Sequence, residues 1–148
     1  MNSFNQTSHI MNSRQHNLKK IRPEISSLTI NDAMSRDERF QNLVLRPITM
    51  MQDDLLNEVF KNYIKKHKNL FYDLSLEKRI NYIENAILKD MKFRNSLKGM
   101  IIGLFTVEEY LIYIENSSAL NKRMMQIVKE RLLSNIQIFE KSELLAAV

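Results

Sequence analysis

Apolar residues recur every three or four positions over most of the chain after residue 35, which is the period of an amphipathic helix. The clearest stripe begins after Pro47 and ends near residue 66. Its central members are Ile48, Met51, Leu55, Val59 and Ile64, with Leu56, Phe60 and Tyr63 beside them. Asp53 and Asp54 come early in this stretch and lysines come late, an order that complements the helix dipole. The pattern predicts one long helix.

A second apolar stripe runs from residue 76 to residue 104 and follows Ser75, a residue suited to cap a helix. Its members are Leu76, Ile80, Ile83, Ile87 and Met91, then Phe93, Leu97, Met100, Ile101 and Leu104. The phase of the stripe shifts near Lys89-Asp90, which predicts either one long bent helix or two helices with a break there. Gly103 is expected to supply a left-handed stop.

A capping box at Ser35–Glu38 marks the expected start of ordered structure, because its Ser and Glu side chains can satisfy free backbone amides reciprocally. A short helix should follow as far as Leu45. Arg46 precedes Pro47, and a residue before proline avoids helical geometry, so we expect a break there and a new helix beginning at the proline.

A second capping box, Thr106–Glu109, predicts another short helix that ends near Asn116. The last apolar stripe then predicts a helix capped by Ser117 or Ser118 and running to about Glu140. The stripe consists of Leu120, Met124, Ile127, Val128, Leu132, Ile136 and Phe139.

Residues 1–34 are polar, rich in Asn and Ser, and without sustained periodicity, so we expect a flexible N-terminal tail. The alternative is a segment that orders on a partner. Residues 35–148 should form the folded domain. The chain has only two Gly and two Pro, whereas strand-rich folds need many tight turns. The predicted fold is therefore all-α, a compact bundle of four to five helices with a mobile tail.

The composition and the apolar runs limit the possible chemistry and the expected cellular location of the protein. The chain has no Cys, which excludes disulfides, thiolate metal sites and cysteine nucleophiles. The first twenty residues hold no apolar run of the kind found in a signal peptide. No apolar run approaches the ~20 residues of a membrane span. The expected location is the cytoplasm.

None of the candidate catalytic groups has the partners that its chemistry requires. His67 is surrounded by lysines, which would repel a metal cation, and no acid lies at helical spacing to orient it. Asp53-Asp54 and Glu108-Glu109 are explained as first-turn residues at the positive end of a helix. Neither a P-loop nor a G-x-G-x-x-G pattern occurs. The sequence predicts no catalytic residues, no metal site and no cofactor, and favours a protein that is not an enzyme.

Basic residues provide one hypothesis about function. The net charge is +5, and two basic stretches have Tyr and Phe interleaved with them. The residues are Lys61, Lys65 and Lys68 in one stretch and Lys89, Lys92, Arg94 and Lys98 in the other. Helices that present such residues can bind phosphates. The excess of positive charge is spread over two-thirds of the chain, however, and a dedicated nucleic-acid site would be denser. Nucleic-acid binding is therefore the alternative hypothesis.

Methionines provide the leading hypothesis. The chain has nine, and Met-rich apolar surfaces adapt to varied partners. Met50-Met51 and Met124-Met125 are adjacent pairs, and we expect only one member of each pair to face the core. The exposed members could form a face, bordered by Lys and Arg, that binds a partner protein or a second copy. The leading prediction is a non-enzymatic regulatory or adaptor module; packing in the core is the competing explanation for these methionines.

The stretch from Leu88 to Gly103, continued through FTVEEYLIYIENSSALNKRMM, resembles a small uncharacterised helical family of Bacteroidetes-type bacteria over about residues 40–139. Some members of that family carry the label glyoxalase. The label implies a strand-rich metalloenzyme with His and Glu ligands. This chain departs from it, since no strand is expected and only one His lies in the part that should fold, so we do not transfer the activity.

Overall fold

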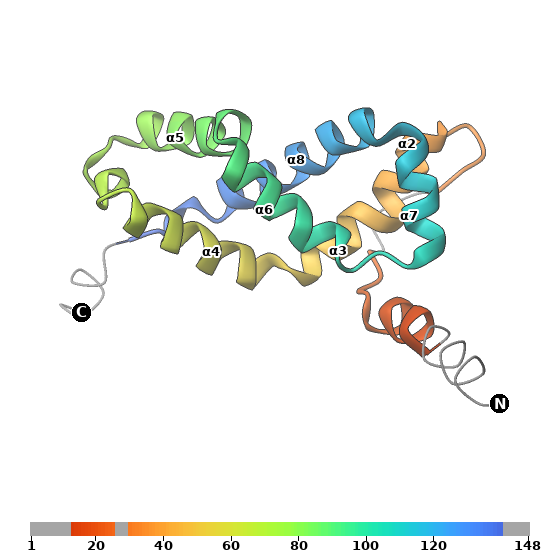
Figure 1. Cartoon of the computed structure of the whole chain (residues 1–148). Helices are drawn as coiled ribbons and strands as arrows, with labels where there is room; N and C mark the ends of the chain where they lie inside the picture. The colour runs from red at the N-terminus through yellow and green to blue at the C-terminus, as the bar shows by residue number, and fades with distance from the viewer. Residues whose placement is uncertain (1–12, 26–29, 141–148) are drawn as a thin grey trace.

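The computed structural model describes residues 13–25 and 30–140. All regular structure in these ranges is helical and no strand occurs in them, so the predicted all-α class is confirmed (Figure 1). The helices are α2 (Arg36–Phe40), α3 (Arg46–Met51), α4 (Asp53–Lys66), α5 (Leu76–Lys89), α6 (Met91–Ile102), α7 (Val107–Tyr113) and α8 (Ser117–Ser134). A π segment (Gln41–Leu45) and 3-10 turns (Leu70–Asp73, Ile114–Asn116 and Ile136–Ile138) join them.

The described helices form an elongated body (Figure 1). Helix α4 follows its lower edge, α5 lies above α4 at the left-hand end, and α6 crosses between the edges. Helices α2 and α7 close the right-hand end, where the helical residues 13–21 also lie. Helix α8 contacts α3, α4, α5 and α6, so it is the element around which the bundle packs.

The core is one continuous cluster of apolar side chains. At the left-hand end it is aromatic: the Phe60 ring lies 4.9 Å from Phe139 and 5.5 Å from Phe71, both edge-on. All three side chains are fully buried. Edge-to-face pairs of this kind stabilise a core beyond the burial of their area alone. This aromatic packing joins α4, the turn after it and the chain that follows α8.

The expected break at Pro47 does not occur, and the chain remains helical from Arg36 to Met51. A proline in a helix lacks a donor, and its ring clashes with the carbonyl of the preceding turn. Here the preceding turn is a π segment, in which the Arg46 amide donates to the Gln41 carbonyl five residues back. The wider turn therefore lets the helix continue through the proline.

Two predictions about apolar or glycine positions are wrong. The apolar period predicts Leu55 within the buried stripe, but Leu55 is 50% exposed, whereas Leu56, Phe60 and Ile64 are fully buried. Gly103 is right-handed, with φ −59°, and is no left-handed stop. Left-handed backbone occurs instead after α4, at Lys68 (φ 64°) and Asn69 (φ 60°). Asn adopts this region more readily than most residues because its short side chain can bond locally.

Two predicted caps form at helix starts, one of them only in part. The Ser75 hydroxyl accepts from the Lys78 amide at 3.4 Å; at Ser35 the hydroxyl accepts from the Glu38 amide at 3.1 Å, which is one half of the predicted capping box. The second stripe divides into α5 and α6, and the break is at Asp90, whose carboxylate accepts from the Phe93 amide at 3.1 Å. Of the two alternatives left open by the phase shift, two helices with a break is correct.

The last helix differs from its prediction at both ends. Ser117 and Ser118 lie inside the first turn of α8, and Asn116 holds the cap position without a side-chain hydrogen bond. The helix ends at Ser134 rather than near Glu140. The Asn135 carboxamide donates to Asp53 at 3.0 Å, and the chain then turns so that Phe139 is buried. Tertiary contacts thus end this helix where the apolar period alone would extend it.

Candidate binding site

The N-terminal segment, residues 13–25, is attached to the body rather than free of it. Residues 13–21 are helical. Arg14 donates to the Phe105 carbonyl at 2.9 Å and to the Gly103 carbonyl at 3.1 Å, and the Gln15 side chain accepts from the Val107 amide at 2.8 Å. These partners lie in the turn between α6 and α7, where backbone groups have no partner within a helix. This part of the expected tail is therefore structured; residues 1–12 and 26–29 lie outside the described residues.

A buried ion pair forms the second attachment. Both terminal nitrogens of Arg22 bond to the carboxylate of Glu109, and one of them also donates to the Leu104 carbonyl at 3.0 Å. The two side chains are only 9% and 11% exposed. Fork-to-fork geometry of this kind makes a strong, directional bond. It connects the N-terminal segment to α7.

Glu109 has a local role as well. Its carboxylate accepts from the Thr106 amide at 2.8 Å while the Thr106 hydroxyl accepts from the Glu109 amide at 3.1 Å, so the predicted capping box is complete. Burial alone would raise the pKa of the Glu109 carboxyl, but the hydrogen bonds from Arg22 and Thr106 outweigh burial and hold that pKa below its ordinary 4.5. Glu109 is therefore a charged, buried anchor.

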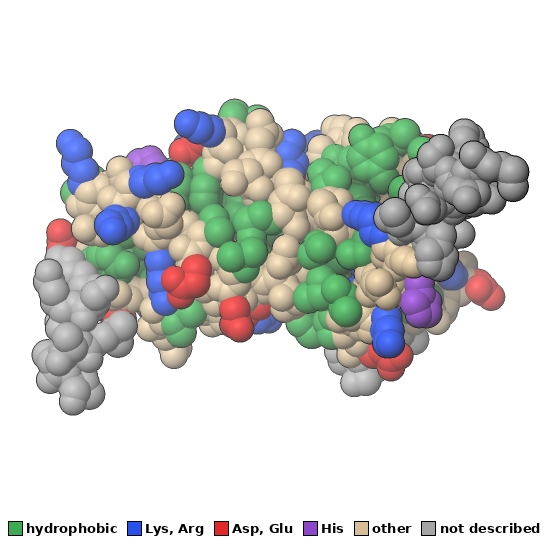
Figure 2. All heavy atoms as spheres, turned by 60° about the horizontal axis from the view of Figure 1, so that its bottom comes forward, with side chains coloured by type: hydrophobic (Ala, Val, Ile, Leu, Met, Phe, Trp, Pro, Cys, Tyr) green, Lys and Arg blue, Asp and Glu red, His purple; other side chains and the backbone are tan. Residues whose placement is uncertain are grey.

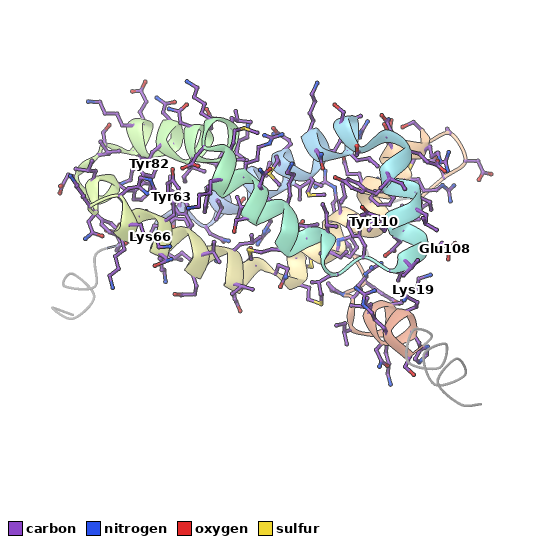
Figure 3. The ribbon with its side chains drawn as sticks, in the orientation of Figure 1. Lys19, Tyr63, Lys66, Tyr82, Glu108 and Tyr110 are labelled. Carbon is purple, nitrogen blue, oxygen red and sulfur yellow. The ribbon has the colours of Figure 1, made fainter. Side chains whose placement is uncertain are left out.

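A groove of about 770 Å³ lies between the N-terminal segment, α2, the π segment and α7. Its floor is apolar, and its rim carries both basic and acidic residues, the basic ones in excess. The floor residues are Ile25, Ile30, Phe40, Leu43, Val44, Pro47 and Ile112; the basic residues are Lys19, Lys20, Arg22, Arg36 and Arg39, and the acidic ones are Glu24, Glu108 and Glu109. Figure 3 shows Lys19 on the N-terminal segment close to Glu108 on α7 at this end of the molecule. The volume falls in the range of ligand pockets, about 300–1,000 Å³.

The rim cations differ in how far they are already neutralised. Arg36 pairs with Glu115 at 2.8 Å and Arg39 with Asp32 at 3.8 Å, both at exposed positions. Lys19 and Lys20 have no ion pair within the described ranges. These two lysines are therefore rim cations without an ion pair, although the carboxylates of Glu24 and Glu108 line the same groove.

The predicted methionine face does not form. Met124 is fully buried and Met125 is 1% exposed, so both belong to the core. The expectation that adjacent positions cannot both be buried fails because α8 is packed against several helices at once. Met51 is half-buried, and Met50, at 43% exposure, is the exposed member of the set. The apolar surface bordered by basic residues lies instead in the groove, which sequence reasoning missed because Arg22 and Glu109 are 87 residues apart.

Most of the predicted basic residues lie toward the other end of the molecule, but Lys98 is in the half of α6 that runs back toward α3 (Figure 1). Lys61 and Lys65 lie on α4, Lys68 follows α4, Lys89 ends α5, and Lys92, Arg94 and Lys98 lie on α6. Of this set only Lys61 makes an ion pair in the described structure, with Glu58 at 3.0 Å. The Tyr63 hydroxyl donates to the Asp90 carboxylate at 2.9 Å, which connects α4 to the junction of α5 and α6.

The described residues form neither a metal-binding group nor a helix that could span a membrane. His67 Nδ1 lies 2.8 Å from the Tyr63 carbonyl, and no group of three or more His, Asp or Glu there could hold a metal ion. No described helix has the length and apolar character needed to cross a bilayer. The described structure thus defines an all-α body with a groove at one end. Comparison with protein-family models, with curated proteins and with solved structures found no match. The suspected family resemblance accordingly stays a prediction.

Proposed function

We propose that the protein is a non-enzymatic interaction module whose groove binds an acidic amphipathic segment of a partner protein. The observation that carries the proposal is the apolar floor of the groove, formed by residues such as Leu43 and Ile112 and bordered by Lys19 and Lys20. Amphipathic helices commonly dock by laying their apolar face into such a groove. Acidic side chains along the polar edge of the segment would then lie against the lysines.

The chemistry of the groove favours a peptide over a reaction. Five of its ionisable residues are basic and three are acidic, and of the acidic residues Glu109 is already engaged by Arg22 and Thr106. General acid–base catalysis needs a group that donates or accepts a proton within reach of the substrate, and Glu24 and Glu108 are the remaining carboxylates of the lining. The floor, by contrast, offers several adjacent apolar side chains, and burying them supplies about 25 cal/mol per Å² of apolar area. Lysines at a rim contribute mainly to orientation and association rate.

The test uses a labelled synthetic peptide with leucines at helical spacing and glutamates beside them, and measures fluorescence anisotropy on addition of the protein. Leu43→Asp should weaken binding about tenfold or more, because it places a charge on the floor. Leu55→Asp on α4 is the matched control, since Leu43 and Leu55 are 48% and 50% exposed and only Leu43 lines the groove. The control should bind like the unmodified protein.

Lys20→Glu provides a second variant that leaves the floor intact. It should weaken binding of the acidic peptide and strengthen binding of a matched peptide in which lysines replace the glutamates. Circular dichroism establishes that each variant remains helical. Equal affinity for the acidic and basic peptides, or equal losses in Leu43→Asp and Leu55→Asp, would overturn the proposal. Sedimentation velocity on the protein alone shows separately whether the bound segment can come from a second copy.

A further inference from the structure

Tyr63 brings together two segments that are far apart in the sequence. Its hydroxyl donates to Asp90, and its ring lies 4.1 Å from the Phe93 ring and 6.1 Å from the Tyr82 ring. On the other side its ring stacks on His67 at 4.1 Å. Figure 3 shows Tyr63 and Tyr82 between α4 and α5, with Lys66 beside them. The end of α4 and the α5–α6 junction therefore form one surface, which we name the basic aromatic end.

Helical spacing sorts the charges on this surface. Lys66 and His67 lie three and four residues after Tyr63, so they share its side of α4. Lys89 lies seven residues after Tyr82 and shares its side of α5. Glu84 lies only two residues after Tyr82, which at 100° per residue turns it to the far side of the helix. Lys89 and Glu84 therefore lie on different sides of α5.

The lysines here are not neutralised. Lys66, Lys89 and Lys92 are exposed and make no ion pair within the described ranges. Asp90 is the carboxylate among them, and it already accepts from the Tyr63 hydroxyl and from the Phe93 amide. Figure 2 shows several Lys and Arg side chains over the end of the molecule formed by α4 and α5, at the left. Three lysine charges therefore stand against one carboxylate.

We propose that the basic aromatic end binds single-stranded nucleic acid. Lys66, Lys89 and Lys92 would contact successive phosphates, and the exposed imidazole of His67, supported by the Tyr63 ring beneath it, would stack against a base. Proteins that bind single strands combine a positively charged surface with aromatic rings on which bases stack. This activity goes beyond the groove, which lies at the opposite end of the molecule (Figure 1).

The predicted strength of the interaction follows from the number of phosphates contacted. Each phosphate neutralised in a single strand contributes about −0.7 to the slope of log K against log salt concentration. Three lysine contacts should therefore produce a slope of about −2. Removing one lysine should reduce its magnitude by about 0.7. Loss of a stacked ring should weaken binding about fivefold or more without changing the slope, since stacking on a base releases no counterion.

The experiment measures anisotropy of labelled oligothymidylate and oligouridylate at several salt concentrations, using the full chain. The variants are Lys66→Ala, Lys89→Ala, Lys92→Ala and His67→Ala, all at exposed positions that leave the core intact. Lys122→Ala on α8 is the matched control, because Lys122 is exposed and lies outside the basic aromatic end. We expect the lysine variants to lower the slope, His67→Ala to lower affinity at unchanged slope, and the control to change neither.

Three results would overturn the inference: no binding at low salt, lysine variants that behave like Lys122→Ala, or equal competition by polyglutamate or a duplex of the same length. The last result would indicate general attraction for anions rather than recognition of a single strand. Leu43→Asp should retain nucleic-acid binding, so a failure here is distinguishable from a failure of the peptide groove. A duplex that binds better than the single strand would likewise assign the surface to another ligand.

Discussion

The ion pair between Arg22 and Glu109 is the contact on which the N-terminal segment most depends, and Arg22→Ala tests it. The substitution removes both bonds to the Glu109 carboxylate and the bond to the Leu104 carbonyl. Glu109 keeps its bond from the Thr106 amide but remains a buried carboxylate without a cation. We expect residues 13–21 to be held less tightly against α7.

The magnitude follows from two opposing effects. Breaking a buried ion pair by removing one partner costs about 3–5 kcal/mol, because the remaining charge is uncompensated. In the native protein, however, Arg22 Nε is buried and has no hydrogen-bond partner in the described structure. An unsatisfied buried donor costs about 1–3 kcal/mol, and the substitution removes that cost together with the side chain. The expected net loss is about 2–3 kcal/mol in the free energy of unfolding.

Urea denaturation followed by circular dichroism measures the loss, and native-state hydrogen exchange shows whether the amides of residues 13–21 lose protection. Arg14→Ala is the matched control, because Arg14 is exposed and bonds only to backbone carbonyls and a neighbouring glutamine. It should cost about 1 kcal/mol or less. In the double variant Arg22→Ala/Glu109→Gln the loss should be smaller than the sum of the single losses. Equal stability of Arg22→Ala and Arg14→Ala would refute the reasoning.

Three further predictions concern the body and its charges. Gly99→Ala should raise the free energy of unfolding by about 0.5–1 kcal/mol, since Gly99 lies in α6 and an added Cβ meets nothing within 4 Å; an unchanged urea midpoint would contradict this. Phe139→Ala should cost about 3–5 kcal/mol in the same assay, because Phe139 is fully buried against Phe60. The pKa of Glu109 is lower in the folded protein than the ordinary 4.5. Its contribution to the free energy of unfolding should therefore be fully present above about pH 4.5 and decrease as the pH falls below that value. Glu109→Gln should flatten that decline between pH 5 and pH 3 in urea titrations, on the order of one proton's linkage.

Signals confined to a few residues predicted the fold well. The box at Thr106–Glu109 and the cap at Ser75 each depend on bonds between residues three apart, and both form as expected. The break at Asp90 was visible as a phase shift in the apolar stripe, although the sequence alone did not distinguish a bend from a break. The structure decides because the Asp90 carboxylate accepts from the Phe93 amide and so starts a new helix.

Predictions failed where the backbone geometry or the packing differed from what a local rule assumes. The rule that a helix ends before proline did not apply at Pro47, because the π segment makes room for the ring. Ser117 could cap a helix, but the chain enters α8 directly from a 3-10 turn. Met125 was expected to be exposed beside Met124, yet α8 has neighbours on more than one side. The apolar period signals neither the π segment nor the 3-10 turn, and the neighbours of α8 come from elements far along the chain.

The difference between local signals and contacts between distant residues also explains the outcome for the two candidate sites. The groove was not predicted, and the basic residues were predicted without the contact that brings them together. Glu109 was correctly recognised as a first-turn acid, but its partner Arg22 lies 87 residues away and carries no motif. The basic stretches were read from the sequence, whereas their meeting through Tyr63 and Asp90 requires the fold. Lys66, three residues after Tyr63, lies outside the predicted set because it does not share the helix face of Lys61 and Lys65.

The net charge of the sequence does not show that arginines and lysines differ in how often they form ion pairs. Among the described residues the ion pairs engage six arginines and one lysine, which are Arg22, Arg36, Arg39, Arg46, Arg79, Arg131 and Lys61. Arginine suits this task because its planar, multi-donor group holds a carboxylate in fixed geometry. Most of the arginines are thus neutralised by ion pairs within the fold, whereas most of the lysines remain unpaired on the surface of the described structure. A thin excess counted along the chain becomes, at the α4–α5 end, a local excess, because folding pairs the charges selectively rather than evenly.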